Sequence, residues 1–144
     1  MMRKTFAIAA AVAGLGVAGC GGDDEALTKA EFVKQGNAIC AKGNAELETK
    51  VEELLAGGKE PDMEAQIAFF EDEVLPIVQG QVDDLGGLTP PEADQGEVDE
   101  LIASAQEAID KAEEDLEAVA AAEEDPFADA NEKAEAYGLT ECAT

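Results

Sequence analysis

Apolar residues recur at intervals of three and four along most of the chain after residue 27, which is the spacing of one face of an α-helix. No segment alternates apolar and polar residues as a half-buried strand does, and no repeat of solenoid length is visible. Glycine and proline pairs divide the pattern into separate stretches. The sequence therefore predicts an all-α domain over residues 28–144.

The first predicted helix has a well-defined start. Thr28 is expected to cap it, Glu31 to complete a capping box, and Leu27 to pack on Phe32 as a hydrophobic staple. Gly57-Gly58 is expected to end it. The apolar stripe between these signals comprises Phe32, Gly36, Ile39, Cys40, Gly43, Leu47, Val51, Leu54 and Leu55.

The second predicted helix carries a proline in its interior. Pro61 is expected in its first turn, and the helical rhythm continues to Leu85 before Gly86-Gly87 stops it. Pro76 lacks a backbone donor and clashes with the preceding turn. We therefore expect a kink or break near Leu75.

The third predicted helix is the longest and runs from about Glu92 to Glu123. A narrow apolar seam defines it, formed by Val98, Leu101, Ile102, Ala105, Ile109, Ala112, Leu116 and Val119. Asp125 as N-cap and Pro126 in the first turn predict a short fourth helix that Gly138 ends. Because the connections are short, neighbouring helices are expected to be antiparallel.

Residues 1–19 have the three parts of an export signal: Arg3 and Lys4, an apolar core, and small residues before a cleavage point. The core is shorter than the roughly 20 residues that span a bilayer. The run from Val17 to Cys20 resembles the lipobox of bacterial lipoproteins. That resemblance implies a signal peptide over 1–19, acylation of Cys20, a lipidated flexible tether over 20–27, and an extracytoplasmic domain anchored to the cell membrane. The alternative, an ordinary secretory signal, would leave Cys20 as a free thiol, which is disfavoured outside the cell.

With Cys20 assigned to lipid, Cys40 and Cys142 form an even pair in an exported chain. We expect them to form a disulfide that joins the first helix to the C-terminal tail. A redox role is disfavoured because the sequence has no Cys-x-x-Cys motif and no histidine. The expected architecture is an antiparallel bundle of three long helices plus a short C-terminal helix, closed by one disulfide.

The chain is strongly acidic, with 34 aspartates and glutamates against nine lysines and arginines and a formal charge of −25. Loss of residues 1–19 removes Arg3 and Lys4, so the remaining chain would carry −27. Such a surface repels phosphate backbones, which excludes nucleic acid as a partner. We interpret most of the acids as solvated helix faces, with divalent cations only as weak surface counter-ions.

Catalytic chemistry finds little support. The absence of histidine removes the common triads, zinc sites and di-iron motifs, and Ser104 is the single serine, expected as a tolerated small residue. Carboxylate clusters at 71–73, at 83–84 and at 97–100 could attract calcium but lack the spacing of a calcium loop. Four aromatic residues could line a cavity between helices or simply fill the core: Phe69, Phe70, Phe127 and Tyr137. The sequence predicts no catalytic residue, cofactor or metal site.

Three features are similar to those of small helical bacterial lipoproteins: a cysteine in the first helix, here Cys40, the segment Pro90-Pro91-Glu92 before an acidic helix, and an ending that runs from Asp125 to Cys142. This resemblance implies a disulfide-closed bundle and transfers no functional residue. Our leading hypothesis is a non-enzymatic, membrane-anchored module that presents a face to a protein partner or to the envelope. The alternative is an extracytoplasmic protein that binds a small solute or cation.

Overall fold

The computed structural model describes residues 25–58, 60–121 and 125–143, and within these ranges the chain forms helices and no strand. The predicted all-α class is confirmed. The predicted signal peptide, the lipidation residue Cys20 and residues 20–24 of the tether lie outside the described residues. Leu27 belongs to the folded domain, because its N–H donates to Thr89 O at 2.9 Å and its side chain packs on the core.

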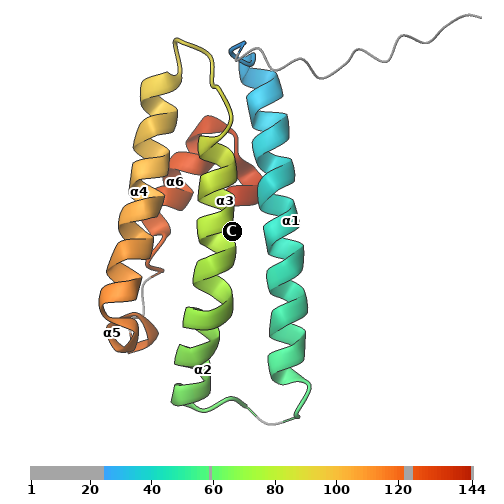
Figure 1. Ribbon diagram of the computed structural model, residues 1–144, viewed down its shortest axis with the longest axis vertical. Helices are drawn as coiled ribbons and strands as arrows, with labels where there is room; N and C mark the ends of the chain where they lie inside the picture. Colours follow the sequence, from blue (N-terminus) through green and yellow to red (C-terminus); the bar gives the residue numbers. More distant parts are fainter. Residues whose placement is uncertain (1–24, 59, 122–124, 144) are drawn as a thin grey trace, which may run out of the picture.

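The helices form a closed ring in which each element contacts the next (Figure 1). Helix α1 (Lys29–Leu55) contacts α3 (Leu75–Gly86), α3 contacts α4 (Gln95–Glu114), and α4 contacts α6 (Ala128–Tyr137). The 3₁₀ turn η2 (Thr140–Cys142) then packs on α1 and completes the ring. The fourth corner of the bundle is thus shared by a short helix and a tail, whereas α1, α3 and α4 run alongside one another in alternating directions.

Helix α1 begins as predicted. Thr28 Oγ1 accepts from Glu31 N–H at 3.3 Å, and Thr28 N–H donates to Glu31 Oε2 at 3.0 Å, which completes the capping box. The far end of its stripe differs from the prediction, because Val51 is 37% and Leu55 51% exposed. Helix α6 is about 15 Å long and α1 about 40 Å, so the fourth corner does not cover the second half of α1.

The second predicted helix consists of α2 (Met63–Phe69), a π-helical turn η1 (Phe70–Val74) and α3. Asp62 caps α2 by accepting from Ala65 N–H, so Pro61 lies before the helix and the expectation of a first-turn proline was wrong. At the predicted interruption, Leu75 N–H bonds to Phe70 O, five residues back. This wider turn directly precedes Pro76 and accommodates a residue that cannot donate, so α2 and α3 follow one line without a break (Figure 1).

The third predicted helix is two helices, so the expectation of one helix from about Glu92 to Glu123 was wrong. Helix α4 ends at Asp115, whose φ of −152° and ψ of 78° leave the helical region, and α5 (Leu116–Ala121) follows. Asp115 Oδ1 accepts from Ala118 N–H at 2.9 Å and so caps α5. The predicted start at Glu92 is also early, because residues 92–94 form a turn, and the predicted end at Glu123 lies outside the described residues.

The C-terminal segment begins later and ends as predicted. Asp125 Oδ1 accepts from Phe127 N–H in a turn before α6, so it does not cap the helix directly and Pro126 lies outside it. Gly138 adopts φ 106°, and Leu139 N–H bonds back to Ala134 O at 2.8 Å. This pairing closes the helix as a Schellman motif and turns Leu139 into the core, where it is fully buried.

Two groups of buried side chains fill the ring. The Phe32 cluster comprises Phe32, Cys40, Leu85, Val98, Leu101, Ala134, Tyr137 and Leu139. The Ile109 cluster comprises Leu75, Val82, Ile109 and Ala112, with partly buried neighbours that include Ile102, Ala105, Leu116, Val119 and Phe127. The apolar seam predicted for the third helix is therefore the inner face of α4 and α5.

Candidate functional site

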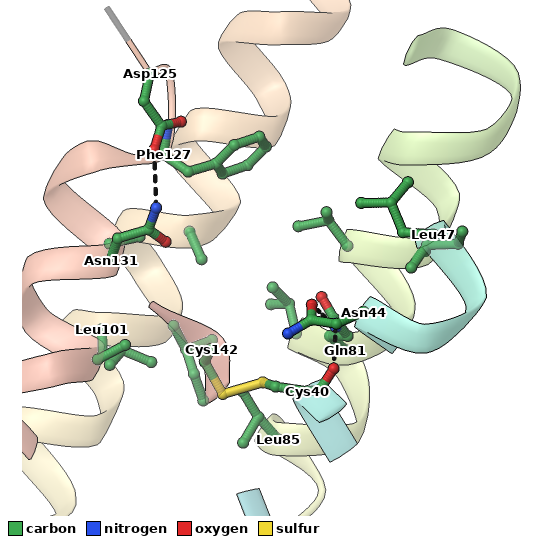
Figure 2. A pocket seen from close by; sticks show the side chains of 17 residues that line it. Cys40, Asn44, Leu47, Gln81, Leu85, Leu101, Asp125, Phe127, Asn131 and Cys142 are labelled. Carbon is green, nitrogen blue, oxygen red and sulfur yellow. Dashed lines mark hydrogen bonds between the residues drawn. A yellow bond between two sulfur atoms is a disulfide. The ribbon is translucent and has the colours of Figure 1, made fainter. Parts of the chain in front are cut away.

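A cavity of about 130 Å³ lies inside the ring, where the Phe32 cluster meets the Ile109 cluster (Figure 2). Each of α1, α3, α4, α6 and η2 contributes to its wall. Its apolar lining is Leu47, Ile77, Val78, Val82, Leu85, Leu101, Ile102, Ala105, Phe127, Ala130 and Ala134, together with the Cys40–Cys142 pair. Three of these positions are alanines on α4 and α6, and their small side chains leave the space that larger residues would fill.

The sulfur atoms of Cys40 and Cys142 lie 2.00 Å apart, a disulfide distance, with 5.0 Å between the Cα atoms. The pair joins α1 to η2 and forms part of the cavity wall (Figure 2). Hydrogen bonds hold the same junction: Asn37 Nδ2 donates to Gly138 O at 3.1 Å, and Glu141 N–H donates to Asn37 Oδ1 at 2.9 Å. The structure thus brings together the two cysteines that the sequence paired.

Polar side chains gather at the rim of the cavity. Gln81 Nε2 on α3 donates to Cys40 O at 3.0 Å and contacts Asn44 Oδ1 at 3.5 Å. On the opposite side, Asn131 Nδ2 on α6 donates to Asp125 Oδ2 at 2.9 Å (Figure 2). The Asp125 side chain is exposed, whereas the three amide side chains are half-buried. The site therefore combines an apolar interior with a rim of amides and one carboxylate.

Gly43 makes room for the Gln81 part of this rim. A Cβ atom at position 43 would lie 2.1 Å from Gln81 Nε2 and 2.6 Å from Gln81 Cδ. The Gln81 side chain therefore lies directly on the α1 backbone, which lets its amide reach Cys40 O. The small residue that the sequence pattern placed on the core stripe positions a polar group of the cavity.

The cavity lining carries one titratable side chain, the Asp125 carboxylate, since its two cysteines are bonded to each other. No charged side chain is buried among the residues that the structure describes. A cavity of this kind can hold a ligand by burial and hydrogen bonding, but it does not supply an acid–base pair.

Ser104, the serine weighed as a nucleophile, links two helices. Its Oγ donates to Asp129 Oδ2, which also accepts from Lys133 Nζ, so α4 is tied to α6 outside the cavity. These bonds, the Lys133 bond foremost, hold the pKa of Asp129 below its usual value. Lys111, two helical turns along α4 from Ser104, pairs with Glu107 at 2.8 Å.

Tyr137 is the most perturbed titratable group. Burial and, next, its hydrogen bond to Asp94 Oδ2 at 3.0 Å raise the pKa of Tyr137 to about 12. Its ring meets Phe32 edge-on at 5.7 Å, and Lys29 Nζ lies 4.0 Å from the ring centroid. Of the four aromatic residues proposed for a cavity, Phe127 lines it, whereas Tyr137 belongs to the Phe32 cluster.

The carboxylate clusters noted in the sequence do not converge. Within the described ranges, no three Asp, Glu or Cys side chains lie together as a group that could hold a metal ion. Over the same residues, no helix is both long and apolar enough to cross a bilayer.

Comparisons of the chain with protein-family models, with curated proteins and with solved structures found no match. Sequence reasoning missed Gln81 and Asn131 as rim residues, although both are amides set among apolar helical positions. The repeated alanines at interior positions were the available signal that the bundle has space at its centre.

Proposed function

We propose that this protein is a lipid-anchored, extracytoplasmic binding protein that holds a small, mainly apolar solute in its central cavity. The cavity is the observation that carries the proposal. Support for the anchor comes from the leader and from the lipobox that ends at Cys20, and an oxidising location suits the Cys40–Cys142 pair. In this proposal the protein performs no reaction.

The size of the cavity sets the size of the solute. A dry apolar cavity of roughly 150 Å³ in another protein holds benzene, so about 130 Å³ suits a body of about six or seven carbon atoms. At about 0.5 kcal/mol per non-hydrogen atom, an eight-atom ligand would bind with about 4 kcal/mol, or a Kd of roughly 1 mM. A natural ligand that also contacts the rim would bind more tightly.

A cavity-filling substitution tests this proposal. Ala105 lines the cavity on α4, and Ala103 is exposed on the same helix. At a benzyl alcohol concentration ten times its Kd, the protein should gain about 1.4 kcal/mol of stability and about 5 °C in Tm. Ala103→Leu should keep this gain and Ala105→Leu should lose it. An equal gain in both variants, or none in the parent, would refute the proposal.

A protein-interaction role is the second candidate. Val51, Leu55 and Met63 are the large apolar side chains exposed among the described residues, with Met63 53% exposed. They lie towards the end of the bundle remote from the first residues of α1 (Figure 1). If Cys20 carries the anchor, this end lies at the opposite end of α1 from the anchored segment. The test is to capture proteins from intact cells with the parent and with two variants. A captured protein that is lost with Leu55→Ser and kept with the control Thr49→Ser would favour this role.

A further inference from the structure

We infer that the cavity selects ligands whose compact apolar body carries a hydrogen-bond donor, an ammonium group above all, and that it rejects carboxylates. This inference rests on the proposed function and adds the chemical class of the ligand. It follows from three observations: which rim atoms remain available, which charges stand at the rim, and how the rim is held.

The amide donors at the rim are largely engaged. Gln81 Nε2 donates to both Cys40 O and Asn44 Oδ1, and Asn131 Nδ2 donates to Asp125 Oδ2. The matching oxygens, Gln81 Oε1 and Asn131 Oδ1, accept no hydrogen bond from any residue that the structure describes. These oxygens come from opposite walls of the cavity (Figure 2). A ligand head that donates hydrogen bonds therefore finds acceptors on both sides.

The charge at the rim has one sign. Asp125 is exposed and carries the single charge among the lining residues, which include no lysine or arginine. Its carboxylate accepts from Phe127 N–H and from Asn131, so a turn fixes its position at the mouth. The whole chain, Asp125 included, carries a formal charge of −25. An ammonium group is thus attracted to the mouth, while a carboxylate meets repulsion and few free donors.

The rim is also held in place from behind. The bond from Gln81 to Cys40 O anchors one wall to the residue that forms the disulfide, and Asn44 Nδ2 donates to Glu141 O at 2.7 Å on η2. The acceptors are therefore fixed before a ligand arrives, which lowers the entropic cost of binding.

Four probes with the same ring test this selectivity: benzylamine, benzyl alcohol, toluene and benzoate. Each is titrated by calorimetry into the oxidised full chain carrying Cys20→Ser. Benzylamine should bind about tenfold more tightly than toluene. Benzyl alcohol should bind with an affinity between these two, and benzoate should bind most weakly of the four. Raising the salt concentration should lower the affinity for benzylamine and leave the affinity for benzyl alcohol unchanged.

Asp125→Asn keeps the oxygen that accepts from Phe127 N–H and removes the charge, but its new NH2 group faces Asn131 Nδ2, so the Asn131 amide must turn over and accept from residue 125. The variant therefore removes the charge and one free acceptor together, and the salt series tests the charge by itself. Asp125→Asn should reduce the preference for benzylamine over benzyl alcohol to within about twofold. Glu132→Gln makes the same charge change at an exposed position of α6 that does not line the cavity, and it should leave the preference intact.

The outcomes separate the two proposals. If toluene or benzoate binds as tightly as benzylamine, and Ala105→Leu abolishes that binding, the cavity is a solute site and the selectivity is wrong. If the preference for benzylamine survives Asp125→Asn or high salt, the role of Asp125 is wrong. If no probe binds, the proposed function fails and the selectivity with it.

Discussion

Removal of the Cys40–Cys142 pair should cost the domain a large part of its free energy of unfolding. The pair closes a sequence separation of 102 residues. In the chain-entropy model, such a loop restricts the unfolded chain by about 5 kcal/mol at 25 °C. This is comparable with the whole stability of many small domains, which lies at roughly 5–15 kcal/mol.

Removing the disulfide should disturb the folded state less than it increases the conformational entropy of the unfolded chain. Leu139 and Tyr137 remain buried, and Asn37 keeps its bonds to Gly138 and Glu141, so the tail should stay docked on α1. Alanine is the suitable replacement because Cys40 is only 2% exposed and serine would bury a hydroxyl there.

The assay is urea denaturation of the oxidised parent, of Cys40→Ala, of Cys142→Ala and of the double variant. Each single variant should lose about 4–5 kcal/mol, and the double variant should lose no more than either. After its disulfide is reduced, the parent should have the same free energy of unfolding as the variants. Losses that add in the double variant would refute a shared bond, and a loss below about 1 kcal/mol would refute the loop-entropy reasoning.

Two further predictions concern the core. Gly36→Ala should destabilise the protein by about 1–2 kcal/mol because its Cβ would lie 2.5 Å from the buried Leu139 Cδ2. Gly80→Ala, whose Cβ would meet nothing within 4 Å, should stabilise α3 by up to about 1 kcal/mol. Equal effects of the two variants in urea denaturation would contradict this packing argument. Tyr137, the one tyrosine, has a pKa of about 12 in the folded protein and about 10 in the unfolded chain. Its contribution to stability is therefore complete below pH 10 and falls by about 1.4 kcal/mol per pH unit between pH 10 and about 12. Tyr137→Phe should flatten this alkaline loss, and tyrosinate absorbance that rises near pH 10 in the folded protein would contradict the assignment.

Local signals in the sequence predicted the fold well where one residue decides the backbone. Thr28 with Glu31 located the start of α1, and Gly138 located the end of α6. Pro76 located the departure from α-helical geometry, which is the π-helical turn η1 rather than a break. Asp115 shows the opposite case. An acidic residue on the polar side of an apolar seam is compatible with a continuous helix. The backbone leaves the helical region at Asp115, and α5 then packs against α2, a contact that local sequence does not indicate.

The stripe on α1 and the candidate site show a different limit. Val51 and Leu55 have the correct helical spacing, but burial depends on whether a partner reaches them, and α6 is too short. Likewise, periodicity indicates which residues face inward without stating how much volume they leave. The cavity arises from the combination of small residues on two helices with a fourth corner that is divided between α6 and η2.

The position of the C-terminal residues has a consequence for biogenesis. Ala134, Tyr137 and Leu139 belong to the same cluster as Phe32, so part of the surface on which α1 packs comes from residues about 100 positions further along the chain. Contacts of such long sequence separation form late and slowly. The Phe32 cluster would accordingly stay incomplete, and α1 only partly packed, until residues 134–139 had been synthesised. A premature stop codon upstream of residue 134 would yield a product whose apolar surface is exposed to proteolysis.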